Sequence, residues 1–132
     1  MKKIEHIGIA VKSLEQAIPV YEKLLQTPCY KTETVASEQV RTAFFQIGET
    51  KIELLESLAP DGVIAKFIEK KGEGIHHIAF DVEDIKQQME TLQNDFTLLQ
   101  ENPKAGADNK NICFLHPKST HGVLVELCAE RT

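Results

Sequence analysis

The sequence predicts an α+β protein built from two tandem copies of a βαβββ unit, whose mixed sheet curves around a metal-binding cavity. The first observation is a repeat, because the strand-like segment 4–11, IEHIGIAV, returns as 75–82, IHHIAFDV. The histidines of the two copies, His6 and His77, are 71 positions apart (77 − 6). The second observation is that each copy leads into a similar helix start, and the third is that a Glu recurs in the last strand of each copy. Internal repeats of this kind indicate an architecture before any single element does.

Both predicted helices begin with the same signal. A Ser or Asp stands three positions before a Gln, at Ser13 and at Asp84, as in a capping box. Apolar residues then recur at helical spacing over 14–25 and 85–92. Pro19 lies inside the first helix, where a missing N–H and a steric clash are expected to bend or weaken it.

Short strand-like runs follow each helix. We expect strands at 30–35, 40–47 and 50–56 in the first copy, and at 96–100, 111–116 and 122–128 in the second. A linker helix is expected at 63–70, ended by Gly72. A chain of 132 residues has the usual size of one domain, so we predict a single domain over 1–132. Its parts are a first module at about 1–57, the linker helix at about 60–72 and a second module at about 73–132.

Strand alternation separates the repeated histidines from the core. In the first copy the apolar residues at 7, 9 and 11 share one face, so His6 lies on the opposite face, next to the small residue Gly8. His77 has the same parity in the second copy, whereas His76 shares the apolar face and is expected to be structural.

Two glutamates have the same parity in the last strand of each copy. Glu53 and Glu126 each lie between apolar residues of a strand, 73 positions apart (126 − 53), close to the spacing of the histidines. A carboxylate in such a strand is costly unless it is paired, hydrogen-bonded or bound to a metal. We therefore predict a metal site made by His6, Glu53, His77 and Glu126, with Glu56 as a competitor for the place of Glu53. Two imidazoles and two carboxylates suit a divalent cobalt, nickel, manganese or zinc ion.

Composition excludes several other classes. The formal net charge of −5 argues against a nucleic-acid surface, which needs a basic patch. No apolar run reaches the roughly 20 residues that span a bilayer, so we expect neither a membrane partner nor a signal peptide. The three cysteines are odd in number and form no CxxC pair, which indicates reduced thiols in a cytoplasmic protein.

Four segments, EHIGIAVKSLEQA, FFQIGETKIELLE, GVIAKFIEKKGEGIHHIAF and FLHPKSTHGVLVEL, resemble the vicinal oxygen chelate superfamily, which includes glyoxalases, bleomycin resistance proteins and dioxygenases. Within it, the resemblance is closest to the methylmalonyl-CoA epimerase family and covers nearly the whole chain. It implies that His6, Glu53, His77 and Glu126 are the metal ligands, with Gln replacing Glu53 in some members. It also implies a homodimer.

This resemblance implies epimerisation of (R)- and (S)-methylmalonyl-CoA by proton abstraction next to the thioester, through a metal-stabilised enolate, with cobalt as the first metal to test. Glu126 is then a candidate base. Some epimerases have a second base in the third strand of the first half, but the segment 39–43, QVRTA, contains no Glu. Glu38, just upstream, and a water molecule are candidates for that role. Lys104 and Lys118 are candidates for contacts with the anionic CoA.

Three other functions are also compatible with the sequence. A glyoxalase I-type lactoylglutathione lyase would use the same four ligands. A non-catalytic drug-binding protein of the same fold would not need them. An iron dioxygenase would use two histidines and only one carboxylate.

Overall fold

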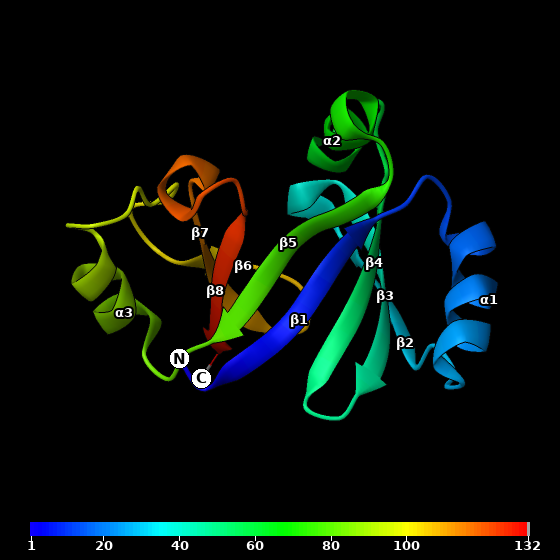
Figure 1. Cartoon of the computed structure of the whole chain (residues 1–132), viewed down its shortest axis with the longest axis horizontal. Coiled ribbons are helices and arrows are strands. Elements are labelled where there is room, and N and C mark those ends of the chain that lie inside the picture. The colour runs from blue at the N-terminus through cyan, green and yellow to red at the C-terminus, as the bar shows by residue number, and fades with distance from the viewer. Residues whose placement is uncertain (132) are drawn as a thin grey trace. The chain divides into compact units, whose positions relative to one another are not determined.

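A computed structural model describes residues 1–131 (Figure 1). The strands are β1 (Lys3–Ala10), β2 (Lys31–Val35), β3 (Val40–Ile47), β4 (Thr50–Ser57), β5 (Gly74–Asp81), β6 (Lys104–Ala105), β7 (Lys110–Leu115) and β8 (Val125–Glu130). The helices are α1 (Leu14–Leu25), α2 (Val63–Lys71) and α3 (Ile85–Leu92), with short 3-10 turns η1 (Ala36–Glu38) and η2 (Pro117–Thr120). The predicted α+β fold class is confirmed.

The chain forms two compact units. One consists of residues 7–76, and the other joins residues 1–6 to residues 77–131. The boundaries fall inside β1 and β5, so that each of these strands contributes residues to both units. His6 and His77 therefore belong to the same unit, although they come from the two different copies of the sequence repeat.

In the unit 7–76 the strand order is β2-β3-β4-β1. The β3–β4 hairpin turns at Gly48, whose φ of 55° suits a residue without a Cβ. Helix α1 packs on one side of these strands, where Val11, Leu14, Ala43, Phe45 and Leu54 form a buried cluster. A separate cluster contains Ile64 of α2 with Ala10, Val40 and Leu55. Alternate residues of β3 and β4 thus enter different clusters, as strand geometry requires.

The expected helix starts are confirmed. The Ser13 side chain accepts a hydrogen bond from the Gln16 backbone N–H at 3.2 Å, and Asp84 Oδ1 accepts one from the Gln87 N–H at 3.1 Å. Each bond satisfies one of the backbone donors that a helix leaves free in its first turn. Helix α1 continues through Pro19 without ending there.

In the unit of residues 1–6 and 77–131, strands β5, β8, β7 and β6 follow one another in that order. β5 and β8 are parallel, with Ala79 opposite Glu126, whereas β7 and β8 are antiparallel. Helix α3 closes the core through Ile85 and Met89, which join the other buried residues Val82, Cys113, Leu115, Leu127 and Ala129.

The strand predicted at 96–100 is wrong. Within this segment only Leu98 makes an isolated bridge, to Leu115. The side chain of Gln100 accepts the Phe114 backbone N–H at 2.7 Å, in place of a regular ladder bond from the main chain. Two main-chain bonds flank this bridge, from the Leu99 N–H to the Phe114 carbonyl at 2.8 Å and from the His116 N–H to the Thr97 carbonyl at 2.7 Å. The two-residue β6 pairs with the other end of β7.

The strand predicted at 122–128 begins later than expected. The turn after η2 extends through His121 and Gly122, which have φ values of 56° and 93°, and β8 starts only at Val125. Val123 therefore lies outside the strand and is 42% exposed, so it does not share the buried face of Leu127.

The described cysteines are free: Cys113 and Cys128 are buried, and Cys29 is partly buried. None of the helices within residues 1–131 is both long and apolar enough to cross a membrane.

Truncation of Leu54 tests the core of the unit 7–76. Leu54 is fully buried, so Leu54→Ala should lower the free energy of unfolding by about 2–5 kcal/mol, measured by urea denaturation. Leu24→Ala is the control, since Leu24 lies on α1 but is 67% exposed, and it should change that energy by less than about 0.5 kcal/mol. Equal effects of the two substitutions would contradict this assignment of the core.

Candidate metal centre

Three buried side chains converge within the unit of residues 1–6 and 77–131. His6 comes from β1, His77 from β5 and Glu126 from β8, and each is no more than 6% exposed. His6 Nε2 and His77 Nε2 are 3.0 Å apart. Glu126 Oε2 lies 3.6 Å from His6 Nε2, and Glu126 Oε1 lies 3.3 Å from His77 Nε2. The three side chains thus direct four ligand atoms at one another.

The strand register brings these groups together. Glu126 stands opposite Ala79 in the parallel β5–β8 pair, and His77 precedes Ala79 by two positions on the same face of β5. Ala79 is fully buried and small, which leaves space beside the longer side chains. The ring of Phe114, from β7, meets His77 edge to face with ring centres 5.8 Å apart. If His77 binds a metal, the apolar ring of Phe114 lies against its imidazole.

The spacing of the donor atoms fits a divalent cation. Imidazole nitrogens and carboxylate oxygens bind a first-row divalent ion at about 2.0–2.2 Å, so that neighbouring ligand atoms are about 3.0–3.5 Å apart. The observed separations run from 3.0 to 3.6 Å. A dication would also supply positive charge to the buried Glu126 carboxylate, whose partners here are two imidazoles that are neutral when they act as ligands.

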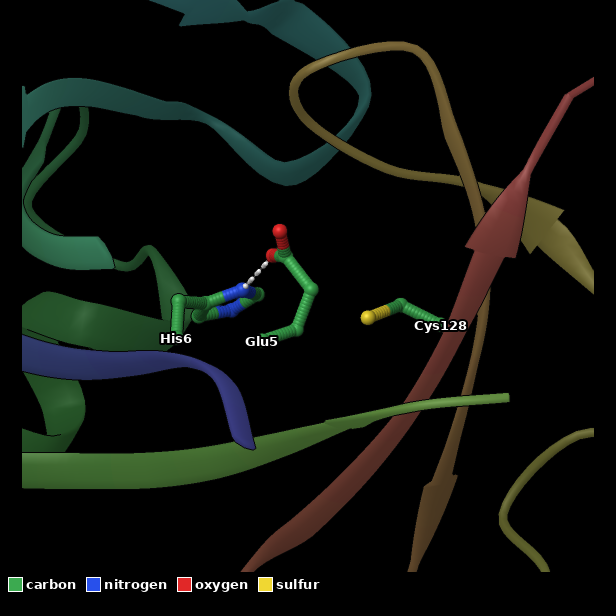
Figure 2. A group of neighbouring side chains, drawn as sticks. All are labelled: Glu5, His6 and Cys128. Atoms are coloured by element: carbon green, nitrogen blue, oxygen red, sulfur yellow. Dashed lines mark hydrogen bonds and ion pairs between the residues drawn. The ribbon is translucent and has the colours of Figure 1, made fainter. Parts of the chain in front are cut away.

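Glu5 joins this group, although no pattern in the sequence pointed to it. It precedes His6 in β1, where simple alternation would turn the two side chains to opposite faces. In the structure Glu5 is buried, and its Oε1 lies 2.6 Å from His6 Nδ1. Figure 2 shows the carboxylate turned toward the His6 ring, with the sulfur of Cys128 pointing toward them.

Glu5, His6 and Cys128 also bring ligand-type atoms within 4.8 Å of one another. Because His6 Nε2 faces His77 and Glu126, an ion in this second group would have to bind Nδ1. That atom is already hydrogen-bonded to Glu5. The Cys128 thiol donates to the Phe80 carbonyl at 3.6 Å. Burial, and then the charge of Glu126 and Glu5, raises the pKa of this thiol. The group is therefore better described as a carboxylate–imidazole pair beside a neutral thiol.

Glu53 lies in the other compact unit. It is buried in β4, on the face opposite Ile52 and Leu54, which pack with α1. Its partner across the strand is Phe44, and Thr42, two residues earlier in β3, lies on the same face. The Thr42 hydroxyl is buried without a hydrogen-bond partner within residues 1–131. Two polar groups thus share a face of β3 and β4 that does not contact α1.

Two competitors for ligand positions have other roles. Glu56 Oε1 accepts the Leu14 backbone N–H at 2.6 Å and so caps the start of α1. His76 meets Phe67 of α2 edge to face, with ring centres 4.9 Å apart. Burial lowers the pKa of His76 to about 4, which keeps it neutral at neutral pH. The predicted separation of His76 from His77 is therefore confirmed in the packing of the two rings.

The other predicted residues occupy peripheral positions. Glu38 lies in η1, immediately before β3, and is partly buried. Lys104 lies in β6 with its Nζ 5.7 Å from the centre of the Phe114 ring, the same ring that contacts His77. Lys118 is exposed in η2. Of the two lysines, Lys104 is the one connected to the candidate centre by packing.

The model of the glyoxalase/bleomycin resistance protein/dioxygenase superfamily matches residues 5–114. The chain belongs to this superfamily. The match includes both histidines of the candidate centre, and it confirms the resemblance inferred from the sequence segments.

The relatives include methylmalonyl-CoA epimerases. The human mitochondrial enzyme is 38% identical over 95% of this chain and 72% of its own length. The ethylmalonyl-CoA/methylmalonyl-CoA epimerase of Cereibacter sphaeroides is 38% identical over 95% of this chain and 96% of its own. A single-residue variant of the Streptomyces coelicolor methylmalonyl-CoA epimerase, solved in complex with 2-nitronate-propionyl-CoA, is 32% identical. It superposes with a TM-score of 0.95 and covers 100% of this chain and 99% of the other.

Alanine substitutions of the adjacent histidines test the candidate centre. His77→Ala removes a convergent nitrogen and should weaken cobalt binding by more than the roughly 10- to 100-fold typical of losing a supporting group. His76→Ala removes a ring that packs on Phe67 and should leave the cobalt affinity close to that of the wild type. Isothermal titration calorimetry measures both, and circular dichroism checks that each variant folds. Equal losses of affinity would show that the two side chains were assigned wrongly.

Proposed function

We propose that this protein is a metal-dependent methylmalonyl-CoA epimerase, which interconverts the (R) and (S) forms of its substrate. The observation that carries the proposal is the convergence of His6, His77 and Glu126 in a chain with epimerase relatives over almost its full length. Full-length relatives constrain the substrate class, and the buried ligand atoms constrain the chemistry.

Glu53 is proposed as the fourth ligand. It is a buried carboxylate on a strand face that does not contact α1, and it precedes Glu126 by 73 positions, as expected from the sequence repeat. His6, Glu53, His77 and Glu126 would then leave room in an octahedral shell for two oxygens of a substrate or water. This mixed nitrogen and oxygen set is compatible with cobalt, nickel, manganese or zinc, and cobalt is the first choice for reconstitution.

The reaction requires removal of the proton at C2, which lies between the thioester and the carboxylate of the substrate. Loss of this proton leaves an enolate with negative charge on the thioester oxygen, and return of a proton to the opposite face completes the inversion. A bound divalent cation supplies Lewis-acid stabilisation of that charge. Stabilisation of developing charge by groups already in place is usually the largest single contribution to catalysis.

Glu126 is proposed as one of the two groups that exchange protons with C2. Its carboxylate is buried, and its two oxygens face the two imidazoles, so in this proposal Glu126 serves both as a metal ligand and as a base. The opposite face of C2 needs a second base. Glu38 and a water molecule are the candidates from the sequence, and Glu38 stays a prediction because it lies in the η1 turn rather than on a strand.

The acyl-CoA is proposed to contact Lys104. This ammonium group lies above the Phe114 ring, which in turn contacts His77, so it flanks the candidate centre within one unit. A positive charge here would attract an anionic substrate although the whole chain carries a net charge of −5. Lys118, exposed in η2, is the second candidate. We also propose that the protein is a homodimer, as the family resemblance implies. A cytoplasmic location is proposed from the cysteine content.

Removal and replacement of the metal tests the proposed function. The metal-stripped protein should not isomerise methylmalonyl-CoA, and addition of cobalt should restore activity, since stabilisation of the enolate charge depends on the cation. In deuterated water, the restored enzyme should incorporate deuterium at C2 of the substrate, which mass spectrometry detects.

The assay includes a glutathione hemithioacetal as a second substrate. If folded, cobalt-bound protein exchanges no proton of methylmalonyl-CoA but isomerises the hemithioacetal, the epimerase assignment is wrong and the protein is a glyoxalase I-type lyase. Activity that is undiminished in the metal-stripped protein would contradict the metal dependence alone.

A further inference from the structure

We propose that Glu5 is a positioning residue, which orients His6 so that its Nε2 atom faces the metal ion. This inference rests on the proposed metal site and adds to it a residue that does not itself bind the ion. It also defines which nitrogen of His6 is the ligand.

The contact between Glu5 and His6 is short and buried. Glu5 Oε1 lies 2.6 Å from His6 Nδ1, and the side chains are 4% and 6% exposed. A carboxylate can only accept a hydrogen bond, so the proton must be on Nδ1. The lone pair of a neutral His6 ring is then on Nε2, which is the atom 3.0 Å from His77 Nε2 and 3.6 Å from Glu126 Oε2. The hydrogen bond thus selects the tautomer that can bind a metal at the point of convergence.

A carboxylate in this position also makes the imidazole a better ligand. Its negative charge raises the basicity of the ring, and the hydrogen bond removes rotational freedom that metal binding would otherwise have to restrict. Glu5 is buried, so its carboxylate has given up most of its contact with water and gains from partners inside the fold. The hydrogen bond to Nδ1 is one such partner, and the positive charge of a nearby dication would be another.

The competing interpretation is that Glu5, with His6 and Cys128, binds a second ion. This would require Nδ1 of His6 as a ligand while Nε2 serves the first site, and Nδ1 is already taken by the Glu5 hydrogen bond. The competing interpretation predicts two ions per chain, whereas a positioning role predicts one. The number of cobalt ions bound per chain therefore distinguishes a second metal site from a positioning role of Glu5.

Calorimetric titration of the full-length, metal-stripped protein with cobalt tests the inference. The wild type should bind one ion per chain. Glu5→Ala should bind one ion roughly 10- to 100-fold more weakly, as is typical when a group that supports a ligand is removed. Glu5→Gln keeps the size and one acceptor oxygen but loses the charge, so its affinity should lie between those of Glu5→Ala and the wild type. Glu83→Gln, at an exposed position of the same unit, is the matched control and should leave the affinity unchanged.

The visible absorption of the bound cobalt gives a second readout that a merely structural role of Glu5 would not change. A shifted ligand-field spectrum in Glu5→Gln, in protein with the wild-type circular dichroism, supports the positioning role. Wild-type affinity and spectrum in both Glu5 variants would overturn the inference while the proposed function stands. Two ions in the wild type, with one lost in Glu5→Ala, would establish the second site instead. Absence of cobalt binding by the wild type would refute the metal site and this inference together.

Discussion

Burial of charged and polar groups at one point of three strands is the constraint on which the proposed chemistry depends. His6, His77 and Glu126 are held within 3.6 Å of one another in a part of the chain that water hardly reaches. Burial of such a cluster destabilises the folded state unless each group has a hydrogen-bond partner or an opposite charge. A divalent cation would be a common partner for all three, and a low-dielectric surrounding would strengthen its effect on a substrate.

The arrangement of the strands explains how His6, His77 and Glu126 come together. The two histidines come from the two copies of the repeat, but they belong to one compact unit, because β1 and β5 each cross from one unit to the other. Neither copy of the sequence repeat therefore needs to contain all the ligands of the candidate metal centre. Each copy contributes a histidine on its first strand, and the parallel β5–β8 pair supplies Glu126 in register.

Glu5 illustrates how the neighbour of a ligand can orient that ligand. Its carboxylate is close enough to His6 to decide which imidazole nitrogen carries the proton, and the other nitrogen is left to face the centre. The adjacent thiol of Cys128 is buried and hydrogen-bonded to the main chain, so it contributes packing rather than a ligand. Glu56 and His76 also have structural roles: Glu56 accepts a backbone N–H at the start of α1, and His76 packs against Phe67 of α2.

Local spacing was enough to assign the helices, their capping residues, most strands and the face on which His6, His77 and Glu126 lie, because strand and helix periods act over a few residues. The tertiary structure alone decided three other features. Glu5 turns toward His6 against the alternation of its strand, the side chain of Gln100 accepts the Phe114 N–H where a strand was expected, and β8 begins only after the turn at Gly122. Each depends on a partner or a turn geometry that the period of a strand does not encode. Contacts between residues distant in sequence therefore decide what pattern alone cannot.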